Sequence, residues 1–114
     1  METGDYGLAI VCYTKSLTLR PTDVTCLIER AECFLRLADF QSAILNYKKA
    51  CLLLPGDMTY RHRLAFIYYL YGQCLFEQNQ FMLALEAFER ARDLDRGNVW
   101  FQYRRFLLFI LIVQ

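Results

Sequence analysis

A set of residues recurs along this chain at a fixed interval of 34 positions. The matched pairs are Asp5-Tyr6 with Asp39-Phe40, Ala9 with Ala43, Tyr13 with Tyr47, Ser16 with Ala50, and Pro21 with Pro55. So many matches at one offset are difficult to obtain by chance. Because one copy of a short repeat cannot bury its apolar face alone, this period predicts that neighbouring copies stack into a single array.

The set returns a third time, but 41 residues after its predecessor, as Gln80-Phe81, Ala84, Phe88 and Ala91. The larger offset means that seven extra residues lie between the second and third copies. Seven residues form almost two turns of an α-helix, so a helix can absorb them and grow by roughly 10 Å while its buried face stays in phase. The insertion is therefore expected to lengthen a helix rather than to add a loop.

Apolar and small residues recur within each copy at steps of three and four, which is helical spacing. One such stripe consists of Ala43, Ile44, Tyr47, Ala50, Cys51 and Leu54. Turn-forming residues separate the stripes, and the expected N-caps include Asp23, Asp57 and Asn98. The sequence predicts an all-α fold of about six helices, near residues 5–19, 23–37, 39–54, 57–77, 79–95 and 98–112.

Most of the apolar pattern is expected to form core. Small residues should let neighbouring helix axes approach closely, at Ala9, Ala43, Gly72 and Ala84. Large aromatic side chains are expected to fill the complementary spaces, from Phe34, Phe40, Tyr47, Phe81 and Phe88.

The helix-turn-helix period, with its small residues, aromatic and closing proline, resembles the tetratricopeptide repeat family. The middle copy carries the motif in Leu27, Ala31, Phe34, Ala43, Tyr47, Ala50 and Pro55, and the third in Tyr68, Gly72, Leu75, Ala84, Phe88 and Ala91. The departures from the motif are Ala31 for glycine, Ser16 for alanine and Arg96 for proline. The resemblance implies an α-solenoid of antiparallel helix pairs in a single domain over residues 1–114. Its expected parts are the second half of repeat one (5–22), repeat two (23–56), repeat three with a lengthened first helix (57–97) and the first helix of repeat four (98–114).

In proteins that this chain resembles, ligands lie along a concave surface formed by the first helix of each repeat. Carried over to this sequence, the resemblance implies a partner-binding surface that includes Glu29, Glu32, Phe66, Tyr69, Gln73, Trp100, Tyr103 and Arg104. The family's Lys and Asn clamp for a terminal carboxylate is largely absent, and Glu29 and Glu32 would repel such a group. The expected partner is a protein or peptide that combines apolar or aromatic side chains with Lys or Arg. The alternative for some of these aromatic rings is packing against an adjacent repeat.

The chain carries no motif that points to an enzyme or a cofactor. There is no glycine-rich phosphate loop, and the single histidine and five cysteines lack metal-ligand spacing. The cysteines are interpreted as reduced, buried apolar residues. A net charge of +1 gives no field that would gather nucleic acid. The basic groups at 61–63 and 104–105 are accordingly interpreted as solvated helix faces.

The end of the chain is strongly apolar over residues 106–113. Spanning a membrane needs about twenty such residues, so a transmembrane helix is not expected. Two alternatives to a peptide-binding scaffold stay open: a structural subunit that self-associates through its terminal helices, and a membrane-associated adaptor that uses the last helix. The first residues lack the pattern of a secretory leader, which favours a cytoplasmic protein.

Overall fold

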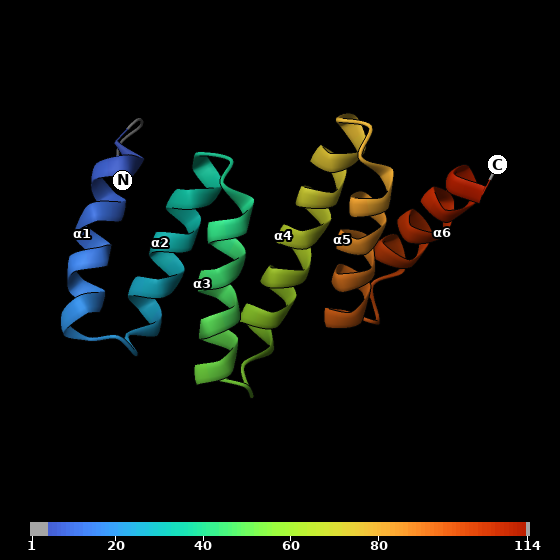
Figure 1. Cartoon of the computed structure of the whole chain (residues 1–114). Helices are drawn as coiled ribbons and strands as arrows, with labels where there is room; N and C mark the ends of the chain where they lie inside the picture. Colours follow the sequence, from blue (N-terminus) through green and yellow to red (C-terminus); the bar gives the residue numbers. More distant parts are fainter. Residues whose placement is uncertain (1–4, 114) are drawn as a thin grey trace. The chain divides into compact units, whose positions relative to one another are not determined.

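The computed structural model describes residues 5–113 and consists there of six α-helices without β-strands (Figure 1). They are α1 (Tyr6–Leu19), α2 (Val24–Arg36), α3 (Phe40–Leu53), α4 (Met58–Glu77), α5 (Phe81–Leu94) and α6 (Val99–Val113). The predicted helices are confirmed, with every end within two residues of its expected place. The helical spacing and the turn residues were therefore sufficient to place each element.

The chain divides into two compact units, the first ending at Tyr60 and the second beginning at Arg61. Unit 1 contains α1, α2, α3 and the first residues of α4, and unit 2 contains the rest of α4 with α5 and α6. The organisation of residues 1–114 as one domain stays a prediction.

Short polar side chains cap the helices where the turn chemistry predicts them. The carboxylates of Asp5, Asp23 and Asp39 each accept a hydrogen bond at 3.2 Å from a backbone N–H three residues further on. Asp57 and Asn98 accept from the N–H groups of Thr59 and Trp100, both at 3.0 Å. Each bond satisfies one of the donors that a helix start leaves unpaired, typically stabilising it by about 1 kcal/mol. The recurrence of Asp5 at Asp39 thus has a structural cause.

In unit 1, α2 packs against both α1 and α3. Small side chains make this possible, because Ala31, Ala43 and Ala50 are fully buried. A polar network links the three helices: the Arg30 guanidinium donates to Asn46 Oδ1 at 2.9 Å and to Thr14 Oγ1 at 3.2 Å. Asn46 is itself buried, so the bond from Arg30 satisfies a carbonyl that would otherwise lose its partner away from water.

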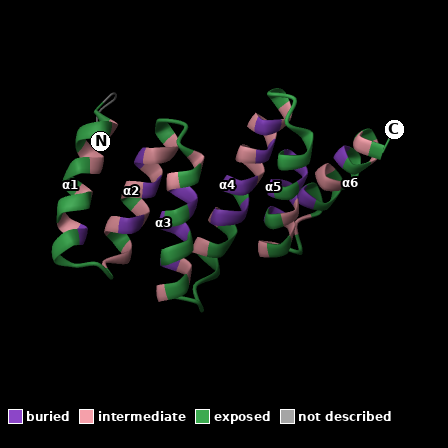
Figure 2. Ribbon diagram, in the orientation of Figure 1, coloured by how far each residue is buried: buried purple, intermediate pink, exposed green. Residues whose placement is uncertain are grey.

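In unit 2, α4 contains 20 residues compared with 13 for α2, which confirms that the insertion lengthens a helix. Gly72 lies where α4 meets α5, and a Cβ atom at this position would stand 2.6 Å from Cε1 of Phe88. The Phe88 ring fills the space that the glycine leaves and is only 1% exposed. Figure 2 shows buried bands on α4 and α5. The core cluster around the ring consists of Leu75, Ala84, Leu85, Ala87, Phe88 and Leu108.

Some predictions about burial are wrong. Phe81, expected in the core, is 39% exposed, because its ring packs edge-on against Phe76 at the end of α4 and not into the helix interface. Cys12 is exposed on α1, since no neighbouring helix covers that side of it within the described residues. Among the cysteines only Cys33 is fully buried, and burial raises the pKa of its thiol.

Candidate functional site

Three of the predicted binding residues form one group on α4. Phe66, Tyr69 and Gln73 follow one another at helical steps of three and four, which places them on the same face. The rings of Phe66 and Tyr69 stack with centroids 6.3 Å apart, and the side-chain amide of Gln73 donates to the Tyr69 hydroxyl at 3.0 Å. Phe66 is 41% exposed. The Phe66 ring is therefore exposed to solvent while its contact with Tyr69 holds it in place.

Tyr69 also belongs to the core of unit 2. Its ring lies 5.8 Å from that of Phe88 on α5 and 5.3 Å from that of Phe101 on α6, both in tilted arrangements. Such pairs contribute roughly 0.5–1.5 kcal/mol beyond the area that they bury. The half-buried Tyr69 thus joins the surface of α4 to the packing of all three helices in the unit.

Two further predicted residues lie at the start of α6. Trp100 is 68% exposed and Tyr103 is 56% exposed, and their rings meet edge to face at 6.4 Å. Phe101, between them in sequence, is the buried contact of Tyr69. We call the aromatic residues of these two groups, together with Gln73, which bonds to the Tyr69 hydroxyl, the aromatic surface. Its members are Phe66, Tyr69, Gln73, Trp100 and Tyr103.

Arg104 stands at the border of this surface and the core. It lines a small notch together with apolar residues of all three helices of unit 2: Phe76, Phe88, Leu107, Leu108 and Leu111. The notch holds about 30 Å³, room for little more than water. The Nε atom of Arg104 is buried there without a hydrogen-bond partner among the described residues. This notch is consequently too small to hold a drug-sized molecule.

The two acidic residues of the predicted site lie in unit 1, on α2. The carboxylate of Glu29 accepts a 2.6 Å hydrogen bond from the Tyr13 hydroxyl, and that of Glu32 accepts one from the Tyr47 hydroxyl. The bond with Glu29 is the largest cause that raises the pKa of Tyr13 to about 12. Neither tyrosine neutralises its carboxylate, because a phenol at neutral pH donates a proton to the bond without carrying charge. The structure therefore places the acidic residues in one unit and the aromatic ones in the other.

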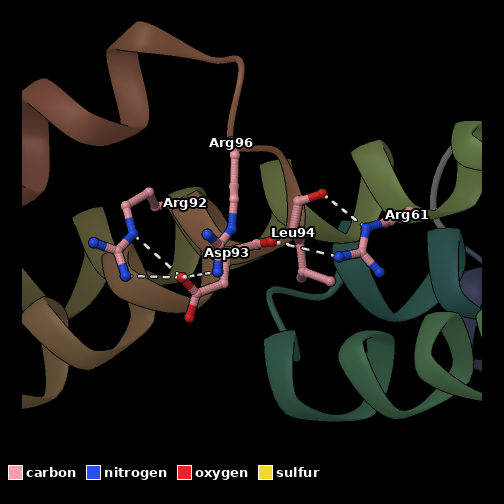
Figure 3. Close-up of polar contacts among 5 residues, drawn as sticks. All are labelled: Arg61, Arg92, Asp93, Leu94 and Arg96. Carbon is pink, nitrogen blue, oxygen red and sulfur yellow. Dashed lines mark hydrogen bonds and ion pairs between the residues drawn. The ribbon is translucent and has the colours of Figure 1, made fainter.

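Sequence reasoning missed a polar contact at the end of α5, drawn in Figure 3. Arg61 donates to the backbone carbonyls of Leu94 and Asp93, at 3.0 Å and 3.4 Å (Figure 3). Next to it, His62 Nε2 lies 3.8 Å from Asp95 Oδ1. Arginine at such a place satisfies carbonyls that a helix end leaves unpaired.

The interpretation of residues 61–63 as a solvated face agrees with the exposure of Arg61 and His62, although both also make polar contacts. The same interpretation of residues 104–105 is wrong, because Arg104 and Arg105 are half-buried and the Nε atom of each is buried. Arg61 and His62 lie in the first turns of α4, in the part that the insertion adds, and these turns reach the C-terminal end of α5. Arg63 places its guanidinium 5.6 Å from the Phe66 ring, a cation–π distance. The seven-residue insertion was the sequence signal for these contacts, because two added helical turns need a neighbouring segment to pack against.

Residues 5–113 contain neither a metal-binding cluster nor a membrane-spanning helix. Across this range, no group of three or more His, Cys, Asp and Glu side chains is arranged to hold a metal ion. Of the helices in the same range, none has both the length and the apolar character that crossing a bilayer requires.

Comparison with known proteins gives matches in sequence and in structure. A family model described as "Tetratricopeptide repeat" matches residues 1–23 and 67–98. Tetratricopeptide repeat protein 16 of Mus musculus is 41% identical over 100 residues, which cover 88% of this chain and 13% of the relative. The Homo sapiens protein of the same name is 38% identical over 104 residues, which cover 91% of this chain and 12% of the relative. The chain thus spans about an eighth of the length of these relatives.

Solved structures resemble the whole described fold. The crystal structure of MamA shares 27% identity at a TM-score of 0.55, over 96% of this chain and 60% of that one. The first TPR of Spaghetti (RPAP3), bound to the HSP90 peptide SRMEEVD, shares 22% identity at a TM-score of 0.52, over 97% of this chain and 82% of that one. The second likeness concerns the fold alone. Together they confirm the predicted α-solenoid of helix pairs.

Proposed function

Because the chain is similar to tetratricopeptide repeat proteins in sequence and in fold, we propose that it is a protein-interaction module that binds a segment of a partner protein through its aromatic surface. Helices α4 and α6 supply the contacts, and the bound segment is an extended stretch or a helix with apolar anchors. The module acts by holding its partner and performs no chemistry on it.

The observation that carries this proposal is the exposure of large rings on ordered helices. Phe66, Trp100 and Tyr103 remain 41%, 68% and 56% exposed although each has a ring contact that fixes its position. Aromatic side chains that are already ordered lose little conformational freedom on binding, and they dominate the energetics of many interfaces. A surface of this kind is suited to receiving apolar side chains of another protein.

The charged residues of the chain indicate which charge the partner segment should carry. The HSP90 peptide in the Spaghetti complex, SRMEEVD, is rich in acidic residues. In unit 2, which carries the aromatic surface, the exposed Glu77 of α4 would oppose a segment of that kind. A segment that combines apolar residues with Lys or Arg suits this carboxylate, so we expect partners of the opposite charge to the HSP90 peptide.

A random peptide library offers a direct test. Peptides selected on the immobilised chain should be enriched in aromatic or aliphatic residues together with Lys or Arg. Trp100 is the only tryptophan, so its emission should shift to shorter wavelength as a selected peptide covers the ring. The chain is kept near 1 μM in this assay so that any self-association does not compete.

Substitutions test whether the selected peptides bind at the aromatic surface. Replacing both exposed rings, Trp100→Ala with Tyr103→Ala, should weaken binding of the selected labelled peptides at least tenfold, at about 1 kcal/mol or more for each anchor. Leu52→Ala is the matched control, because Leu52 is 81% exposed on α3 and outside the aromatic surface. Equal affinities for the double variant and the control would show that the peptides bind elsewhere.

A further inference from the structure

A second uncovered face of α6 lies away from both the core and the aromatic surface. Phe101 and Leu108 point into the core, and Trp100 and Tyr103 belong to the aromatic surface. At 100° per residue, the remaining face lies roughly a third of a turn from each of these two. We call it the α6 seam, and it consists of Val99, Gln102, Phe106, Phe109 and Val113.

The seam is exposed along its length and apolar at every position except Gln102. Val99 is 74% exposed, Phe106 58%, Phe109 49% and Val113 64%, and Figure 2 shows α6 with long exposed stretches. Its members follow one another at alternating steps of three and four residues. This is the spacing of a strip along which two helices pack side by side.

The α6 seam is poorly suited to close packing against another helix of the repeat type. Phe106 lies 34 residues after Gly72 and so occupies the same position of its repeat as Ala31 and Gly72 do in theirs. At those two positions the small side chain lets a neighbouring helix pack closely. At Gly72 that neighbour's aromatic ring comes so close that even one added carbon would overlap it. A phenylalanine there holds a second helix further away, so the seam requires a partner that interdigitates with large rings.

A second copy of the chain meets this requirement. Val99 and Val113 each lie seven residues from Phe106, which is the central residue of α6. Two antiparallel α6 helices related by a two-fold axis at Phe106 would place Val99 against Val113 of the other copy, and the two Phe106 rings side by side. We propose that the α6 seam is the interface of an antiparallel homodimer.

The positions of the charged residues and the area available for burial are both compatible with a second copy of the chain. The charged residues of α6 are Arg104 and Arg105, both half-buried and outside the seam, so no like charges meet across the axis. The five exposed side chains of the seam each leave on the order of 100 Å² uncovered, or about 1,000 Å² for two copies. This reaches the lower limit for a biological interface, which corresponds to a weak dimer with a Kd in the micromolar range.

The oligomeric state tests the proposal. Sedimentation velocity of the full chain should show a monomer near 1 μM and a dimer near 300 μM. Phe106→Glu should abolish the dimer over this range, since it brings two carboxylates together at the axis. The matched control is Trp100→Glu, at a 68% exposed position on another face of the same helix, which should dimerise like the natural chain. Both variants should retain the helical circular dichroism signal.

A mixing experiment tests the axis itself. Phe106→Lys alone should also be monomeric, whereas an equimolar mixture of Phe106→Glu and Phe106→Lys should form a dimer again, because residue 106 faces its own copy. A monomeric natural chain at every concentration would overturn the proposal, as would a dimer that survives Phe106→Glu or a mixture that fails to associate. Binding of a monomeric chain to phosphatidylcholine vesicles, lost in Phe106→Glu, would overturn it in favour of a membrane surface.

Discussion

Replacing Gly72 by alanine tests how closely α4 approaches the Phe88 ring of α5. An added Cβ would lie 2.6 Å and 2.7 Å from two carbons of the Phe88 ring and 3.1 Å from a third. Carbon atoms prefer separations of roughly 3.5–4.0 Å, so the ring or the helix must move by about 1 Å. Phe88 is 1% exposed and surrounded by the core cluster, which leaves the ring no open space to enter.

Two opposing effects set the size of the change. Overpacking a core of this kind costs about 3 kcal/mol at the upper end of its usual range, and alanine gains about 1 kcal/mol over glycine in a helix. We expect Gly72→Ala to reduce the free energy of unfolding by about 2 kcal/mol. The melting temperature should fall by about 10 °C for a chain of this length.

A double-mutant cycle separates the two effects. In a Phe88→Leu background the ring is absent, so Gly72→Ala should no longer destabilise and should gain about 1 kcal/mol from helix propensity. Gly7→Ala on α1 is the control, because a Cβ there meets nothing within 4 Å and the change should not destabilise. Urea unfolding, followed by circular dichroism, measures all of these. A destabilisation by Gly72→Ala that is the same in both backgrounds would refute the contact with Phe88 as its cause.

Three further changes have expected outcomes. Arg61→Ala should lower the free energy of unfolding by about 1 kcal/mol and speed amide exchange at the end of α5, whereas Arg90→Ala, in an exposed pair with Glu86, should change stability by only a few tenths. Ala38→Gly should raise the melting temperature by roughly 5 °C, because Ala38 has a φ of 59° that costs an alanine about 1 kcal/mol. The raised Tyr13 pKa means that the fold favours its protonated phenol, so this stability is present below pH 10 and is lost as pH rises towards 12. A natural chain and a Tyr13→Phe variant, unfolded in urea across that window, should therefore converge in stability.

Repeat spacing predicted the fold well because each repeated residue has a local structural task. Asp5 and Asp39 cap helices, Ala43 and Gly72 allow close packing, and Phe88 fills the space beside Gly72. Such tasks depend on residues a few turns apart, so the sequence alone reveals them. The lengthened α4 followed for the same reason, since seven residues keep the phase of a helix.

The parts that sequence did not predict depend on longer distances. Arg61 meets Leu94 and Asp93, more than thirty positions away, and a basic group in sequence gives no sign of which carbonyls it will reach. The exposed Phe81 fits the apolar pattern of α5 as well as a core residue does, and only the packing against Phe76 distinguishes the two cases. Pattern identifies which residues can be buried, whereas the neighbouring helices decide which of them are.

Tyr69 shows why the site and the core of unit 2 are not independent. Its hydroxyl bonds with Gln73 at the aromatic surface, while its ring contacts Phe88 and Phe101 in the interior. A Tyr69→Ala change would remove both sets of contacts, so a loss of binding in that variant would not distinguish a missing anchor from a displaced α6. Trp100 and Tyr103 do not have this double role, because most of each side chain is already in solvent. Binding energies for the aromatic surface therefore follow from these two residues, and the coupling between binding and folding follows from comparing them with Tyr69.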